Sequence, residues 1–215
     1  MKLLDLDSST TWFELYNQFI ENDVLWPRIK SLIASPDETI FNNYLAQFYY
    51  VNDHVTENEF VDLRLRCLTF VEGQYTHVAA YHACRPVDIS TYTTRGICPS
   101  DTKVYLFVSR RGALVTEGLL KYGSELLSAI AGRIGQLAKD KLAMRGTPML
   151  FQCAIPLNWL DTSEKLYYSV QPLAQVIHIK RLPDKKDIDC EGGFALTRGI
   201  SPNLILEAID MSGVC

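Results

Sequence analysis

The feature that most constrains the fold is a change of sequence pattern after residue 74, from helical periodicity to short apolar runs. The run Tyr75–Tyr81 predicts a buried strand that delivers His82 and Arg85 close together at its end. Pro86 is typical of the first turn of a helix, and Gly96 is typical of the left-handed position that follows one. The sequence therefore predicts a polar pair at a junction between a strand and a short helix. Ligands bind at such junctions in many α/β proteins.

The chain before this point predicts helices. Ser8 begins a run of capping residues, and apolar residues then recur at helix-face spacing from Trp12 to Ile20. The tetrapeptide Ser-Pro-Asp-Glu at 35–38 is typical of a helix N-terminus, because it combines a cap, a proline and two acids. We therefore expect residues 1–70 to form a helical N-terminal extension and residues 71–215 to form the main domain.

The second half of the chain predicts strands around one long helix. An apolar stripe over Leu127–Leu142 indicates a helix about 30 Å long, which Gly146 and Pro148 end. Short apolar runs predict strands at Lys103–Ser109, Met149–Ile155, Lys165–Val170, Leu173–Lys180, Gly193–Thr197 and Asn203–Asp210. The run at 103–109 is continuous, which predicts a strand covered on both faces. The expected fold class is α+β: a helical segment, then a mixed, strongly twisted β-sheet with a long packed helix.

Composition and charge exclude several classes of protein. The 215 residues carry a formal net charge of −4, which argues against an affinity that depends on a broad basic surface, as in most non-specific nucleic-acid binders, but leaves a local basic groove open. The 6 cysteines form no CxxC pair and no zinc-like cluster, so no metal site is expected. The acidic N-terminus is unlike a secretory signal, and no window approaches the roughly 18 apolar residues of a membrane span. We expect a cytoplasmic protein with reduced thiols.

A second candidate site is the tetrapeptide Tyr122-Gly123-Ser124-Glu125, at the start of the expected long helix. Gly123 permits a sharp turn, Ser124 can cap the helix, and Glu125 can lie in its first turn. Ordinary capping explains the same spacing. The tetrapeptide therefore gains functional meaning only from the segment around His82.

The segment YHACRPVDISTYTTRGI, residues 81–97, resembles the first motif of the ADP-ribosyltransferase superfamily: a strand carrying His or Arg, a helix, then Gly-Ile or Gly-Leu. The strand KVYLFVS and the later Tyr, Ser and Glu agree with this resemblance, which covers roughly residues 75–210. It implies an enzyme of the toxin-like branch that transfers ADP-ribose from NAD to a nucleic acid or a protein. Such small bacterial or phage-related effectors are often held inactive by a partner, so residues 8–70 are expected to bind an antitoxin-like protein.

The resemblance implies a reaction that needs a fixed carboxylate. Breaking the bond between nicotinamide and ribose develops positive charge on the ribose, which a carboxylate near the 2′-hydroxyl stabilises. Glu125 is expected to be this catalytic residue, with Ser124 orienting it or donating to the ribose. Glu191 and Glu207 compete for the role, because the family usually places its glutamate on a late strand or loop.

The resemblance also implies how NAD is bound. His82 is expected to hydrogen-bond the adenosine ribose, and Arg85 to pair with the pyrophosphate, whose oxygens match its planar fork. Tyr122 is expected to stack on the nicotinamide ring, and Tyr105 is a second stacking candidate.

Two other functions stay open at this point. If water replaces the macromolecular acceptor, the protein is an NAD glycohydrolase. If the cleft is inactive, it is a non-catalytic binding module of a toxin–antitoxin-type complex, with an exposed apolar patch on residues 8–70.

Overall fold

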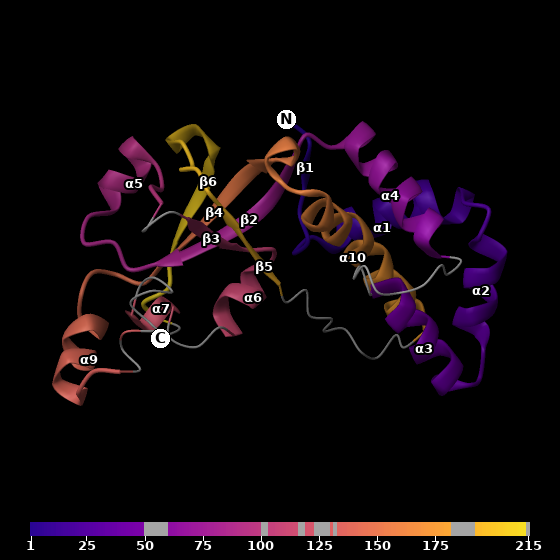
Figure 1. Ribbon diagram of the computed structural model, residues 1–215, viewed down its shortest axis with the longest axis horizontal. Coiled ribbons are helices and arrows are strands. Elements are labelled where there is room, and N and C mark those ends of the chain that lie inside the picture. The colour runs from indigo at the N-terminus through magenta and orange to yellow at the C-terminus, as the bar shows by residue number, and fades with distance from the viewer. Residues whose placement is uncertain are drawn as a thin grey trace. The chain divides into compact units, whose positions relative to one another are not determined.

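The computed structural model of the chain describes residues 1–49, 60–99, 103–115, 119–122, 130, 133–181 and 192–213, without the side chains of residues 44–49, 119 and 122. Its contacts divide the chain into two compact units (Figure 1). The helical unit comprises Met1–Val78 and Pro156–Ile188, and the sheet unit comprises Ala79–Ile155 and Asp189–Cys215. These ranges differ from the expected division at residue 70, because residues 156–188 group with the N-terminal helices.

The helical unit contains the helices that the sequence predicts before residue 74. Its elements are β1 (Leu3–Leu4), α1 (Ser9–Phe19), η1 (Ile20–Asn22), α2 (Trp26–Ala34), α3 (Glu38–Tyr49), α4 (Phe60–Gln74), η2 (Leu157–Trp159) and α10 (Thr162–Arg181). The Ser8 hydroxyl caps α1 by accepting from the N–H of Thr11 at 3.4 Å. Asp37, rather than Ser35, caps α3, because its carboxylate accepts from the N–H groups of Thr39 and Ile40.

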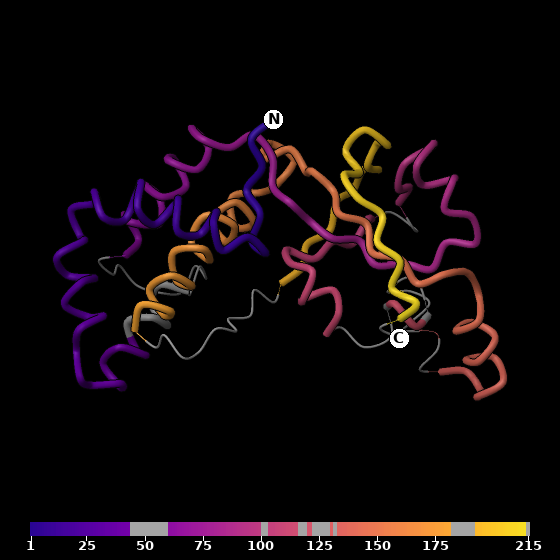
Figure 2. The backbone as a smooth tube through the Cα atoms, turned by 180° about the vertical axis from the view of Figure 1, so that it is seen from behind, coloured from indigo at the N-terminus to yellow at the C-terminus, as the bar shows by residue number. Residues whose placement is uncertain are grey.

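Helix α10 is the centre of the helical unit. It packs against α1, α2, α3 and α4, and every side chain of Tyr168–Ile177 is buried. In Figure 2 its orange coil lies among the indigo and purple coils of the N-terminal helices. The Cys67 thiol on α4 reaches the Ser169 carbonyl oxygen at 3.2 Å, so α4 and α10 are in direct contact.

The strands expected at Lys165–Val170 and Leu173–Lys180 are therefore wrong, since both runs belong to α10. A helix buried on all sides loses the apolar–polar periodicity that identifies a surface helix. The sequence of its buried part is then a largely continuous apolar run, and a buried strand has the same pattern. Pro172, which suggested the end of a strand, lies inside the helix, and His178, which suggested an alternating strand, lies in its last turn.

The sheet unit is organised on an antiparallel sheet. Its strands are β2 (His77–Cys84), β3 (Val104–Phe107), β4 (Met149–Pro156), β5 (Gly193–Leu196) and β6 (Ile205–Asp210), in the order β5-β3-β2-β4-β6. The pairs β2–β3, β3–β5 and β4–β6 are antiparallel, and β1 pairs in parallel with the first residues of β2. The expected combination of helices with a sheet is confirmed, and these five strands agree with the sequence to within a few residues.

The remaining elements of the sheet unit are short. They are α5 (Ile89–Arg95), α6 (Arg110–Val115), α7 (Leu119–Tyr122), α9 (Gln136–Ala143) and η3 (Pro202–Leu204). The single long packed helix expected over 127–142 is wrong, because Arg133 and Ile134 form a turn and a bend and Gly135 is the N-cap of α9. Helix α9 buries none of its residues, so it is not the helix that covers the sheet.

Both faces of the sheet are covered by helices. One face, here called the core face, carries a buried cluster to which α6 and α7 contribute: Tyr81, Ala83, Ala113, Leu120, Leu150 and Met211. The other face, here called the α5 face, carries Phe151, on which the ring of Tyr92 from α5 stacks at 5.0 Å between centroids. Within the described residues, no helix combines the length and the hydropathy that crossing a bilayer requires.

Candidate functional site

The first motif has the order that the sequence predicts, with one shift. Strand β2 ends at Cys84, and α5 begins at Ile89 with Asp88 as its N-cap, so Pro86 precedes the helix and does not begin it. Gly96 ends the helix at φ +82°, as expected of a left-handed position. Ile97 then pairs with Ile200, and a Cβ at Gly96 would collide with the Ile200 carbonyl oxygen. The motif is therefore fastened at both ends to the sheet unit.

His82 directly follows Tyr81, the residue of β2 that pairs with Phe107 of β3. The His82 side chain also contacts β3, with Nδ1 2.9 Å from the Tyr105 carbonyl oxygen. Because a carbonyl oxygen only accepts, Nδ1 of His82 carries the hydrogen and donates it. Nε2 of the neutral ring is then an acceptor, and it forms no hydrogen bond to the residues that the structure describes.

The electrostatic setting keeps His82 neutral. Burial lowers the pKa of His82 below its ordinary 6.5, and the bond to the Tyr105 carbonyl offsets this only in part. The residue as a whole is intermediate between buried and exposed. Near neutral pH it can therefore accept a hydrogen bond from a hydroxyl group of a ligand.

Arg85 uses its side chain differently from the prediction. Its guanidinium donates to three backbone carbonyl oxygens: Leu120 at 2.9 Å, Gly146 at 3.0 Å and Arg145 at 3.1 Å. An arginine has five N–H groups, so at most two of them can bind a pyrophosphate. The expected role of Arg85 in binding NAD stays a prediction, but most of its donors already have protein partners.

The predicted binding residues lie on opposite faces of the sheet. Successive side chains of a strand alternate between faces, so His82 belongs to the α5 face, opposite Tyr81. Arg85 reaches α7, which packs on the core face. Tyr105 shares the core face, because Phe107, two residues on, pairs with Tyr81. The three side chains therefore do not converge on one socket, as the sequence had led us to expect.

The Tyr105 ring is 42% exposed. Strand β3 alternates buried and accessible side chains, so the prediction that it is covered on both faces is wrong. Because the ring is accessible, Tyr105 has the aromatic surface that stacking on a ligand requires.

Glu207 lies in a polar row on the core face. It is opposite Gln152 in the β4–β6 ladder, and Gln152 donates from Nε2 to the Tyr81 hydroxyl at 3.0 Å. Arg110, the first residue of α6, approaches the Glu207 carboxylate at 3.8 Å. Both charged side chains are about half exposed, so this ion pair is accessible to solvent.

Gln152 and Arg110 are neighbours of Glu207 that the sequence does not predict. Gln152 had a readable signal, since it is the one polar residue in the strand MLFQCAIP. No sequence pattern identifies Arg110, because its contact with Glu207 depends on how α6 packs against the sheet. The side chain of Tyr122, and all of Ser124, Glu125 and Glu191, lie outside the described residues.

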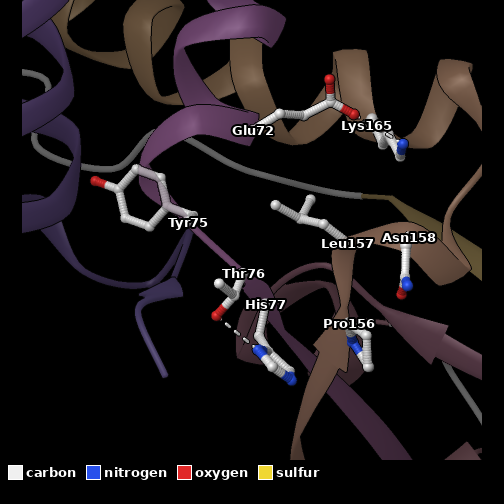
Figure 3. Close-up of a pocket in the computed structure, with 8 residues that line it drawn as sticks. All are labelled: Glu72, Tyr75, Thr76, His77, Pro156, Leu157, Asn158 and Lys165. Carbon is white, nitrogen blue, oxygen red and sulfur yellow. Dashed lines mark hydrogen bonds and ion pairs between the residues drawn. The ribbon is translucent and has the colours of Figure 1, made fainter.

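A separate pocket lies within the helical unit (Figure 3). It has a volume of about 400 Å³ and is lined by Glu72, Tyr75, Thr76, His77, Pro156, Leu157, Asn158 and Lys165. Glu72 and Lys165 form an ion pair at 2.8 Å on its wall, so their charges offset each other. The pocket contains none of the predicted site residues, and this neutralised pair gives it no excess positive charge for an anionic dinucleotide.

The chain was compared with family models, curated proteins and solved structures. No family model, no curated protein and no solved structure matches this chain.

Proposed function

We propose that this protein is an NAD-dependent ADP-ribosyltransferase that modifies a macromolecule, either a nucleic acid or a protein. The observation that carries the proposal is the first motif: a buried strand with His82 near its end, a short helix, and a Gly-Ile turn fastened to the sheet. The antiparallel sheet with helices on both faces is compatible with the expected fold. The resemblance of the motif supplies the reaction.

His82 supports the proposal through its hydrogen-bonding state. With Nδ1 donating to Tyr105, the neutral ring offers Nε2 as an acceptor for a hydroxyl donor. The ribose hydroxyls of NAD are such donors. The role expected of His82 therefore agrees with the tautomer that its environment selects.

The position of His82 also bears on the choice of catalytic carboxylate. Glu207 lies on the core face with Gln152, whereas His82 lies on the α5 face. A substrate bound to His82 would have to pass round the sheet to reach Glu207. Glu125 follows α7 in the sequence, and α7 also packs on the core face, so the face of the sheet does not decide between the two. We favour Glu125 as the carboxylate that stabilises the oxocarbenium-like transition state on the basis of the resemblance alone.

The test measures two products at once. The protein is incubated with NAD labelled in the adenylate, together with cell extract, and both nicotinamide release and label in macromolecules are measured. We expect both signals, and we expect a loss of at least about 100-fold in Glu125→Gln, the scale of losing a preorganised electrostatic group. Glu207→Gln is the matched control and should retain activity. His82→Ala should raise the KM for NAD, whereas His77→Ala should not.

Other results would redirect or refute the proposal. Nicotinamide release without labelled macromolecule would identify an NAD glycohydrolase. Loss of activity in Glu207→Gln, with Glu125→Gln active, would reverse the choice of carboxylate. No NAD turnover by the wild type under any condition would refute the enzymatic function and leave the binding-module hypothesis.

A further inference from the structure

Arg85 connects parts of the chain that are distant in sequence. The Leu120 carbonyl oxygen that it binds belongs to α7, and the Arg145 and Gly146 carbonyl oxygens follow α9. The same guanidinium therefore binds residue 120 and residues 145 and 146, which are about 25 residues apart in the sequence. One side chain thus joins both of these segments to the end of β2.

The backbone around Gly146 is built for this close approach. Gly146 has φ +67°, a conformation that other residues adopt only with strain. A Cβ there would collide with the Pro86 carbonyl oxygen and would lie 2.9 Å from that of Arg85. The N–H of Thr147 also donates to the Pro86 carbonyl at 3.3 Å. The turn is thus held against residues 85–86 by backbone as well as side-chain contacts.

Helix α7 is held by packing too. Leu120 is 7% exposed and belongs to the core cluster with Tyr81 and Ala83. Helix α7 ends at Tyr122, which begins the tetrapeptide that carries Ser124 and Glu125. The helix that Arg85 fixes therefore leads directly into the segment expected to perform the chemistry.

We propose that Arg85 is a positioning residue: it holds α7 and the turn at 145–147 against the end of β2, and α7 is the helix that precedes the expected catalytic tetrapeptide in the sequence. The catalytic consequence of this role rests on the proposed function, whereas the structural consequence does not. The role needs an arginine, because a planar fork with five donors can meet three carbonyl oxygens in fixed directions. A lysine keeps the charge but has one nitrogen, which cannot reach all three.

The first measurement is hydrogen exchange on the full chain, comparing wild type with Arg85→Ala, Arg85→Lys and Arg95→Ala. Arg95 is an exposed arginine on the neighbouring helix α5 and serves as the matched control. We expect amides of residues 119–122 and 136–147 to exchange about tenfold faster in both Arg85 variants, the scale expected from losing hydrogen bonds to a charged group. Arg95→Ala should exchange like wild type.

The second measurement is NAD turnover, which separates positioning from binding of the pyrophosphate. A positioning role predicts that kcat falls in both Arg85 variants while KM changes little, and that lysine does not restore activity. A pyrophosphate ligand predicts a raised KM, partial rescue by lysine and unchanged exchange, and this result would overturn the proposal. If Arg85→Ala fails to fold, Arg85→Lys alone decides.

Failure of the two proposals can be told apart. If the wild type does not turn over NAD, the proposed function fails, but the exchange data still report on Arg85. If exchange at 119–122 and 136–147 is unchanged in Arg85→Lys, the positioning role is refuted whatever the activity.

Discussion

His82 and Arg85 lie three residues apart and use their nitrogens in opposite ways. The Arg85 guanidinium donates hydrogen bonds to three backbone carbonyl oxygens and so joins segments that are distant in sequence. His82 donates from Nδ1 to the Tyr105 carbonyl oxygen, which leaves Nε2 as an acceptor. The Arg85 side chain therefore suits a structural role, whereas the His82 side chain suits the binding of a ligand.

The lowered pKa of His82 predicts how stability depends on pH. Because the folded state binds the proton more weakly than the unfolded state, the neutral ring contributes stability above pH 6.5, and this contribution is lost as the pH falls toward the folded-state pKa. We expect the free energy of unfolding, measured by urea denaturation, to fall less on acidification from about pH 7.5 to about pH 5.5 in His82→Gln than in wild type. Gln18→Ala, at an exposed position without a titratable side chain, is the control and should follow the wild type. Equal pH dependence in all three proteins would contradict the prediction.

Helix α10 shows how burial changes the sequence pattern by which a helix is predicted. Its residues Tyr168–Ile177 touch protein on every side, so they stabilise the helical unit through packing and not through an amphipathic face. Arg181 at its end donates to the Ile33 carbonyl at 3.0 Å, which ties the last turn of α10 to α2. The element therefore acts as the core around which the N-terminal helices assemble.

This position predicts a large effect of a single truncation. Leu173 is 0% exposed, so Leu173→Ala removes apolar contacts and leaves a cavity, and we expect the free energy of unfolding to fall by about 2–5 kcal/mol. Leu137→Ala on α9, where the side chain is 73% exposed, should change it by less than about 0.5 kcal/mol. Chemical denaturation of both variants measures the difference. A small effect at Leu173 would show that α10 is not packed as described.

The two units of the molecule are not consecutive along the chain. The chain enters the sheet unit within β2, returns to the helical unit at Pro156 and enters the sheet unit again near residue 189. Each unit therefore needs segments from both halves of the sequence. A division at residue 70 would separate α1–α4 from α10, which is their common core.

This arrangement predicts the behaviour of a shortened protein. A fragment of residues 71–215 keeps α10 but loses the helices that cover it, so it exposes the apolar side chains of Tyr168–Ile177. We expect the fragment to aggregate and to lack the cooperative thermal transition of the full chain. Size-exclusion chromatography and circular dichroism test this directly. A monomeric fragment with a sharp transition would support the original division.

The sequence by itself determined the features that depend on near neighbours. The Ser8 cap, helix α1, strand β4 and the positive φ at Gly96 follow from periodicity and from the steric limits of the backbone. Such signals are carried within a few residues, so they can be read without knowing the rest of the fold.

Only the tertiary structure decided which remote groups meet. It made α10 a helix, because burial on all sides removed the periodicity that would have identified it. It gave Arg85 three carbonyl partners that lie 35, 60 and 61 residues away, and it placed His82 and Tyr105 on opposite faces through the register of β2 and β3. These contacts depend on how segments pack and pair, and no local pattern encodes a partner that lies so far along the chain.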